Sequence, residues 1–310
     1  MSPVRGVLLW ASQNRWMKER FPRYPFVRRA VQRFMPGEEV KDALAASAVF
    51  HKQGISTILT LLGENVADEA AARGVVRHYE GVLEQIQSAG LDAEISVKLT
   101  HLGLDLGASC SADLLLELVE AAARRGAMVW VDMEGSAYTQ ATIDVFRTVR
   151  QKRPNVGLCL QAYLRRTQAD LEDLIALGSA IRLVKGAYAE PRSIAFPSKV
   201  EVDTSFLRLA ERMLQPDALK SGARIAIATH DRGMIRRVQE AAVARSVPRE
   251  VFEFAMLYGI QSGEQMRLAA EDYRVRVLIS YGAEWFPWYM RRLAERPANL
   301  WFVARNLFAQ

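Results

Sequence analysis

The stretch with the clearest chemical content is residues 181–188, IRLVKGAY. Arg182 lies within an apolar run, and a buried guanidinium is costly unless it has a partner or faces a polar cavity. The run then ends in Lys185, Gly186 and Tyr188, which offer a charge, a close backbone approach and an aromatic ring. Lys185 beside Gly186 suits a phosphate-bearing cofactor. The pattern predicts a buried parallel strand that ends at a ligand site.

Charged and polar side chains also follow other apolar runs. Lys98 and Asp132 could bind a carboxylate, with Asp132 orienting the lysine, or could form an ion pair that only fills space. Arg182 beside an electron-accepting ring would stabilise the negative charge that appears on reduction. His230 is either a ligand-facing donor or a core histidine. Further candidates are Glu64, Glu134, Gln161, Tyr163, Thr229, Asp231, Glu253, Leu257 and Tyr281.

A second concentration of such residues lies near the C-terminus, in the helix predicted over residues 283–296. Arg291 and Arg292 could together clamp one carboxylate through bidentate hydrogen bonds. The neighbouring aromatic residues, Trp288 among them, would wall off an apolar substrate body. The alternative is an exposed basic turn with a surface ion pair.

The elements that must position these residues alternate strictly between strand and helix from residue 54 onward. Such alternation predicts parallel strands covered by helices. Eight repeats predict an α/β fold of the closed (βα)8 TIM-barrel type, in which the strands' carboxyl ends share one rim and bring the candidates together. An open doubly wound sheet is the alternative, but no GxGxxG follows the first strand. The predicted strands are residues 55–62, 93–100, 127–134, 156–163, 181–188, 224–231, 251–257 and 274–282.

Residues 1–53 are expected to form extra N-terminal helices, and residues 54–310 the barrel domain with its last helix over the strand ends. The arginines and aromatic residues between positions 20 and 34 form either a patch for anionic lipid or a packed helical layer. The longest apolar piece near the N-terminus, VLLWA, is too short for a transmembrane helix. We therefore expect a cytoplasmic protein with peripheral contact to the inner membrane.

The composition excludes several classes of protein. The 310 residues include 41 basic and 35 acidic ones, a net charge of +6 that is no nucleic-acid signature by itself. Two cysteines without CxxC spacing argue against a disulfide framework or a zinc site. The four histidines show no HExxH or HxH spacing, so no metal site is expected.

Six motifs along the chain together resemble the proline dehydrogenase family. They occur in the family's order and spacing, each at a predicted strand end or on the last helix, which makes the resemblance specific. It is closest to the short, monofunctional bacterial enzymes, because the chain is too short for an additional aldehyde dehydrogenase domain. The motifs are VDME (131–134), LQAYLRRT (160–167), IRLVKGAY (181–188), ATHD (228–231), EFAMLYG (253–259) and YGAEWFPWYMRRLAERPANLWFV (281–303).

The resemblance implies a distorted barrel that binds FAD non-covalently. It implies oxidation of L-proline to Δ1-pyrroline-5-carboxylate, the first step of proline catabolism to glutamate. Hydride would pass from the ring carbon next to nitrogen to flavin N5, and the electrons would go on to a membrane quinone.

The resemblance also implies roles for individual residues. Lys98, Arg291 and Arg292 would hold the proline carboxylate, and Asp132 would hold Lys98 in place. Arg182 would lie beside flavin N5. The pyrrolidine ring would contact Tyr188, Leu257, Tyr281 and Trp288. FAD would contact Met133, Gln161, Arg182, Lys185, Gly186, Ala187, Thr229 and His230.

Two positions depart from the family pattern, and one further interaction can be predicted. Ala255 stands where many relatives carry glutamine, so one polar contact to FAD is expected to be missing, and Trp288 stands where some relatives have tyrosine. We also expect Glu64 to pair with Arg291 and gate the proline site, the alternative being a carboxylate at a helix start.

Two other functions are consistent with parts of the sequence. A Schiff-base aldolase on the same barrel would use Lys98 or Lys185 as its nucleophile. A non-enzymatic protein would bind a membrane or nucleic acid through its basic N-terminal helices. The convergence of charged residues on one rim favours the enzyme.

Overall fold

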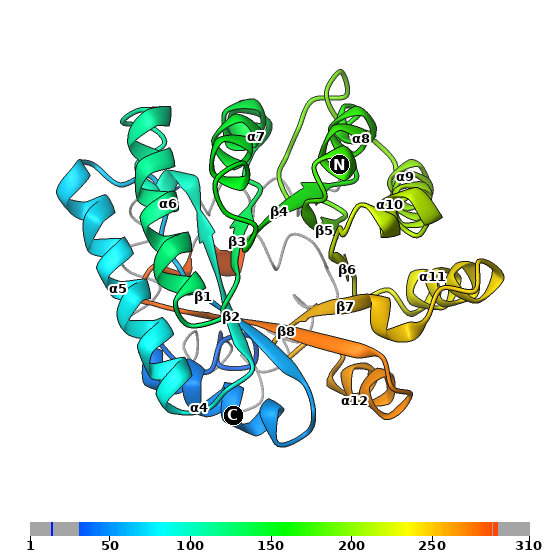
Figure 1. The fold of residues 1–310 in the computed structure, drawn as a ribbon, viewed down its shortest axis with the longest axis horizontal. Helices are drawn as coiled ribbons and strands as arrows, with labels where there is room; N and C mark the ends of the chain where they lie inside the picture. Colours follow the sequence, from blue (N-terminus) through cyan, green and yellow to red (C-terminus); the bar gives the residue numbers. More distant parts are fainter. Residues whose placement is uncertain (1–13, 15–30, 287, 291–310) are drawn as a thin grey trace.

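Eight parallel strands form a closed barrel in chain order (Figure 1). The computed structural model describes residues 14, 31–286 and 288–290. The cylinder closes because β1 pairs with both β2 and β8. The predicted (βα)8 barrel is thus confirmed. Its strands are β1 (Ser56–Leu61), β2 (Ala93–Lys98), β3 (Val129–Asp132), β4 (Val156–Gln161), β5 (Ala180–Val184), β6 (Ile225–Ala228), β7 (Phe252–Leu257) and β8 (Arg274–Tyr281).

Helices surround the strands, as the alternation of the sequence predicts (Figure 1). Residues 285, 286 and 288–290 of the predicted last helix are helical, and its remainder lies outside the described residues. The helices are α4 (Val40–His51), α5 (Glu69–Ser88), α6 (Ala108–Ala123), α7 (Ser136–Arg150), α8 (Thr167–Ala176), α9 (Lys199–Met213), α10 (Pro216–Lys220), α11 (Arg232–Ala244) and α12 (Ser262–Ala270), with short 3-10 turns η2 (Leu99–Leu102) and η3 (Arg249–Val251).

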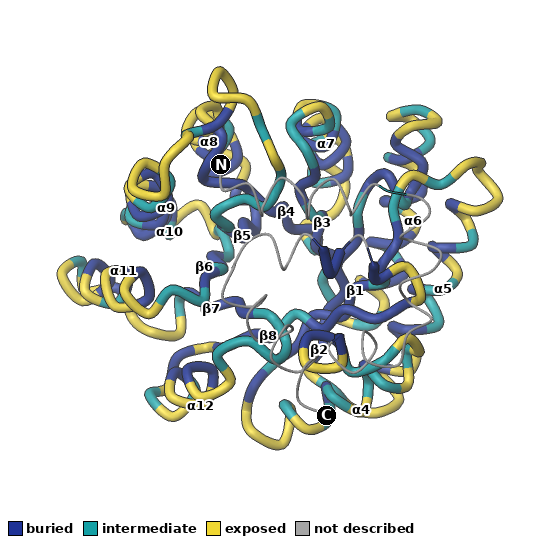
Figure 2. Tube along the Cα trace, turned by 180° about the vertical axis from the view of Figure 1, so that it is seen from behind, coloured by how far each residue is buried: buried dark blue, intermediate teal, exposed yellow. Residues whose placement is uncertain are grey.

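The burial pattern follows this architecture (Figure 2). Dark blue marks the strands and the inner helix faces, while yellow marks the outer helix faces. The strands are buried on both sides, by the helices outside and by their own alternate side chains inside. Helix α4 packs against β1, where Ser47 hydrogen-bonds Thr57. The division of the chain between residues 53 and 54 stays a prediction.

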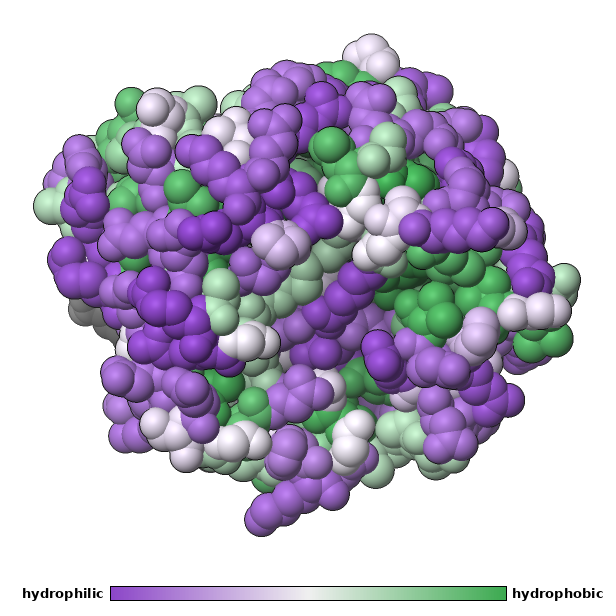
Figure 3. Space-filling model, viewed as in Figure 1, coloured by the Kyte–Doolittle hydropathy of each residue, from purple (hydrophilic) through white to green (hydrophobic). Residues whose placement is uncertain are grey.

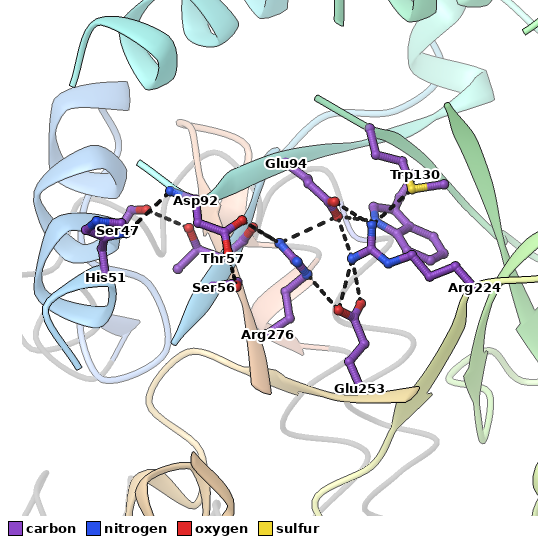
Figure 4. Close-up of polar contacts among 11 residues, drawn as sticks. Ser47, His51, Ser56, Thr57, Asp92, Glu94, Trp130, Arg224, Glu253 and Arg276 are labelled. Carbon is purple, nitrogen blue, oxygen red and sulfur yellow. Dashed lines mark hydrogen bonds and ion pairs between the residues drawn. The ribbon is translucent and has the colours of Figure 1, made fainter. Parts of the chain in front are cut away.

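An ion network fills the barrel near the start of its strands (Figure 4). Arg224 and Arg276 alternate there with Glu94 and Glu253. Arg224 contacts Glu253 at 2.9 Å and also pairs with Glu94, while Arg276 Nε donates to Glu253 at 3.1 Å. Glu253 was expected among the candidates at the strand ends. It is the second residue of β7 and therefore lies near the start of the strand, not at the rim where the strands end. We call this group of Glu94, Arg224, Glu253 and Arg276 the floor network.

The face of the molecule seen in Figure 3 is mostly hydrophilic, with hydrophobic groups in smaller areas between the charged ones. No helix among the described residues combines the length and the apolar character needed to cross a bilayer.

Candidate functional site

Side chains on the inner face of the strands meet at the barrel's C-terminal end. Lys98 and Asp132 are paired in register between β2 and β3, and Cys159 and Arg182 are paired between β4 and β5. Inward orientation follows from contacts between strands that are not neighbours, such as Arg182 on β5 with Ser96 on β2. The structure therefore brings the predicted catalytic residues Lys98, Asp132 and Arg182 to one end of the barrel.

Arg182 is the central charge of this group and is only 3% exposed. Its Nη2 donates to Asp132 Oδ1 and, at 3.0 Å, to Ser96 Oγ. Burial by itself would lower the pKa of Arg182, but the Asp132 carboxylate outweighs this and raises the pKa above its ordinary value. Among the described residues, its buried Nη1 has no hydrogen-bond partner. A fixed cation with an unused donor is suited to a negative group placed above it.

Lys98 binds a carboxylate other than the expected one. Its Nζ lies 2.9 Å from Glu64 Oε2, on the loop after β1, and the side chains are 14% and 29% exposed. Asp132, which was predicted to hold Lys98, is engaged by Arg182 and Ser96 instead. Backbone register makes Lys98 and Asp132 neighbours, but their side chains choose different partners. The predicted partner of Glu64, Arg291, lies outside the described residues, as does Arg292.

His101 lies next to this pair and was not singled out from the sequence. Its ring packs against Gly63, directly before Glu64. Burial, assisted by the positive charge of Lys98, lowers the pKa of His101 to about 4. The ring is therefore neutral at physiological pH, whereas Lys98 brings a positive charge to Glu64.

Lys185 faces the helix side of the rim and joins a second charge cluster. Its Nζ contacts Asp203 on α9 at 2.5 Å and Asp231 at 3.2 Å. Asp231 also begins α11 by accepting the N–H groups of Gly233 and Met234. Lys185 thus ties the end of β5 to the starts of two helices.

Gly186 has a structural reason for being glycine. Its φ is +112°, and a Cβ there would lie 2.2 Å from the Tyr163 ring. The sequence suggested that this glycine lets a ligand approach. The structure shows that it makes room for Tyr163.

The side chains of several residues predicted to bind the cofactor form hydrogen bonds with backbone groups at the ends of neighbouring strands. Gln161 Nε2 donates to the Glu134 carbonyl at 2.7 Å, and His230 Nε2 accepts the N–H of Leu257 at 2.8 Å. Thr229 Oγ1 accepts the N–H of Asp231 at 3.2 Å. Met133 is buried in the core, and Ala187 is partly exposed.

The predicted substrate residues are placed in three ways. Leu257 is partly exposed at the end of β7, and Tyr188 is partly exposed four residues after β5, which ends at Val184 and not at residue 188 as predicted. Trp288 is buried in an aromatic cluster that includes Phe34 and Trp285. Tyr281 is 1% exposed, and its hydroxyl lies 2.9 Å from His78 Nε2 on α5.

The structure also reveals neighbours that were not predicted from the sequence, namely Ser96, Trp130, His78 and Thr100, the last of which is paired with the predicted candidate Glu134. Thr100 Oγ1 donates to Glu134 at 2.7 Å, and burial raises the pKa of that carboxyl. Ser96 and Trp130 each stand two positions before a predicted catalytic residue, Lys98 and Asp132. The two-residue period of a strand could therefore have placed them on the same inner face.

A closed parallel barrel with charged side chains gathered where its strands end is the arrangement of a barrel enzyme. The family model described as Proline dehydrogenase matches residues 43–305. The chain therefore belongs to the proline dehydrogenase family, which confirms the resemblance seen in the motifs.

Similar proteins support this assignment over nearly the whole chain. Proline dehydrogenase 1 of Bacillus subtilis (strain 168) is 34% identical over 304 residues, which cover 98% of this chain and 99% of that protein. Proline dehydrogenase of Deinococcus radiodurans is 34% identical over 285 residues, 89% of each chain.

A solved structure shares the fold. The crystal structure of proline utilization A from Bdellovibrio bacteriovorus, inactivated by N-propargylglycine, aligns with a TM-score of 0.82 at 23% identity. The alignment covers 99% of this chain and 38% of that longer chain. At this identity the likeness shows the fold alone.

Proposed function

We propose that the protein is an FAD-dependent oxidoreductase that converts L-proline to Δ1-pyrroline-5-carboxylate. The observation that carries the proposal is the buried cation of Arg182, whose Nη1 has no hydrogen-bond partner among the described residues, at the end of the barrel where active sites of this fold lie. Family membership supplies the reaction and the substrate.

The residues present fit a flavin on chemical grounds. The fixed charge of Arg182 is suited to a ring that gains negative charge when it is reduced. When bound, FAD supplies the acceptor for the hydride that proline loses. The residues that would hold it are Met133, Gln161, Arg182, Lys185, Gly186, Ala187, Thr229 and His230.

Proline is a zwitterion, so its site needs cations for the carboxylate and apolar groups for the ring. Lys98 provides a cation, and Arg291 and Arg292 are proposed to join it. Glu64 already accepts from Lys98, so an arriving carboxylate must share or displace this contact. The ring would be enclosed by Tyr188, Leu257, Tyr281 and Trp288.

The partners beyond proline follow from the family resemblance. We propose that a quinone takes the electrons and that the protein contacts the inner membrane peripherally from the cytoplasm. This reaction would begin the breakdown of proline to glutamate.

An absorbance spectrum of the purified protein before and after anaerobic L-proline tests the proposal. A flavin band that bleaches on addition of proline is the expected result. A band that persists would reject proline as the reductant. A colourless protein that stays inactive with added FAD, and whose lysines trap a substrate with borohydride, would favour the aldolase. That outcome is not expected, because Lys98 and Lys185 are both engaged by carboxylates.

A further inference from the structure

The indole ring of Trp130 lies in the middle of the barrel between the floor network and the rim. It is fully buried, and two guanidiniums lie over it. The Cζ of Arg182, at the rim, is 5.2 Å from the ring centroid, and that of Arg224, in the floor network, is 5.3 Å away. Both distances are within the range of a cation–π interaction, which is strongest on tryptophan and in desolvated sites.

The neighbouring strands are built to accommodate this ring. Trp130 is in register with Gly157 on β4, and Gly157 is in register with Ala180 on β5. Both neighbours are small, and a Cβ at Gly157 would lie 2.6 Å from the indole Cε3. The row directly above, two residues along each strand, contains Asp132, Cys159 and Arg182. The small residues thus let one large ring extend beneath the Arg182 guanidinium.

The ring is also fixed in orientation from below. Trp130 Nε1 donates to Glu94 Oε2 at 2.7 Å, and Glu94 is itself paired with Arg224 (Figure 4). Asp132 and Ser96 hold Arg182 at Nη2 only, so they fix one edge of the guanidinium. The indole is therefore a fixed aromatic surface next to the guanidinium, in addition to the contacts with Asp132, Ser96 and Cys159.

We propose that Trp130 is a positioning residue that sets the plane and the electrostatic environment of Arg182 and, through Arg182, the reduction potential of the bound flavin. The proposal rests on the proposed function, because it assumes that Arg182 serves the cofactor. Trp130 itself touches neither substrate nor cofactor in this account.

The test compares Trp130→Leu with Trp130→Phe in the FAD-loaded protein. Leucine removes the aromatic face, whereas phenylalanine keeps one. In Trp130→Leu we expect the rate of flavin reduction by proline to fall about ten-fold, as loss of a desolvated cation–π contact allows. The Kd for proline should stay unchanged, and the flavin's midpoint potential should become more negative. Trp130→Phe should recover most of the rate and the potential.

Phe146→Leu is the control for loss of core packing, because Phe146 is fully buried on α7 and away from the site. It should lower the thermal unfolding temperature without shifting the flavin potential. The inference is overturned if Trp130→Leu behaves like Phe146→Leu, or if Trp130→Phe loses as much as Trp130→Leu.

Gly157→Ala provides a second route if Trp130→Leu does not fold. The added methyl group must displace the indole while the tryptophan itself is kept. Gly81→Ala is the matched control, because nothing lies within 4 Å of a Cβ at that position of α5. We expect the flavin potential to shift in the Gly157 variant alone, and an unshifted potential would overturn the inference. If the unsubstituted protein binds no FAD or is not reduced by proline, the proposed function itself fails.

Discussion

A buried charged side chain at a functional site needs partners, but these must leave some of its hydrogen-bonding groups available for a ligand. Arg182 meets this condition, since Asp132 and Ser96 both bind its Nη2 and its Cζ lies 5.2 Å from the centre of the Trp130 ring. Lys98 meets it differently, because a single carboxylate at the rim can be displaced by a ligand. Arg182 is therefore a charge with fixed partners, whereas Lys98 is a charge whose partner a ligand can replace.

Lys98→Met tests the exchangeable charge. Removing a charge-assisted hydrogen bond to the substrate costs about 1.5–3 kcal/mol, so the Kd for proline should rise by roughly ten-fold or more. The measurement is flavin bleaching against proline concentration. Lys41→Met, at an exposed surface pair, is the control and should leave the Kd unchanged. An unaltered Kd in Lys98→Met would remove Lys98 from the proline site.

Gly186→Ala tests the packing of Tyr163 against β5. The alanine would be strained at a φ of +112°, and its Cβ would lie 2.2 Å from the Tyr163 ring. Because both effects act together, the free energy of unfolding should fall by about 2–4 kcal/mol. Gly222→Ala, at φ +79° with nothing within 4 Å of its Cβ, isolates the backbone strain. It should cost about 1 kcal/mol. Urea titration of both variants gives the comparison, and equal losses would contradict the packing account.

The pKa of His101 makes stability depend on pH. Between pH 6.5 and about 4 the unfolded chain binds a proton that the folded chain does not, so stability falls as the pH decreases through this window. The loss is on the order of 3 kcal/mol at most. In His101→Asn the difference between pH 7 and pH 4 should shrink, as measured by urea unfolding at each pH.

At the scale of elements, the rim is assembled where strands end and helices begin. Asp231 illustrates this, because it follows β6, caps α11 and contacts Lys185 at the end of β5. Asp68 performs the capping task alone at α5, where it accepts the N–H of Ala71 at 2.8 Å. Substituting each aspartate therefore compares the stability contributed by a helix cap alone with that of a cap that also forms an ion pair.

Asp68→Ala should cost about 1 kcal/mol, and Asp231→Ala should cost more because Lys185 also loses a carboxylate. Burial opposes ionisation of Asp231, but Lys185 outweighs this and lowers its pKa. The ion-pair part is thus present above the ordinary carboxyl pKa of 3.8 and is lost as the pH falls through the lower folded value. Thermal unfolding at pH 7 and at low pH measures both parts. Equal costs of the two substitutions at pH 7 would show that the Lys185 contact adds nothing.

The barrel could be predicted from the sequence because the periods of strands and helices are local properties of the chain. The side-chain partners across the barrel could not, because they depend on residues that are distant in the sequence. Asp132 was predicted to hold Lys98, and the two residues are neighbours in register, but their side chains bind other partners. Their actual partners are Glu64, on the loop after β1, and Arg182, on β5. The periodicity of the sequence predicts neither the conformation of a loop nor the direction of a side chain. Trp130 was missed for the same reason, because its role depends on Gly157 on β4, on Arg182 on β5 and on Arg224 directly before β6.

At the scale of the whole molecule, the floor network joins three strands, β2, β7 and β8, and the residue directly before β6. Glu253 on β7 binds Arg276 on β8 and Arg224 before β6, and Arg224 reaches Glu94 on β2. Each arginine is matched by a carboxylate, so burial is tolerated only while all members are present. The network should therefore contribute more to the free energy of unfolding than surface ion pairs do.

Glu253→Gln should test this. It leaves two arginines of the floor without their shared carboxylate, and breaking a buried ion pair on one side costs about 3–5 kcal/mol. Glu120→Gln, whose exposed carboxylate pairs with Arg153 at 2.8 Å, should cost about 1 kcal/mol or less. Urea unfolding followed by circular dichroism compares them. Because Arg276 and Arg224 lower the pKa of Glu253 despite its burial, the difference between wild type and Glu253→Gln should persist at pH 5 and narrow only below the ordinary carboxyl range. Equal losses in the two variants would mean that the floor network behaves as surface ion pairs do and that the barrel closes through its apolar core and backbone ladder alone.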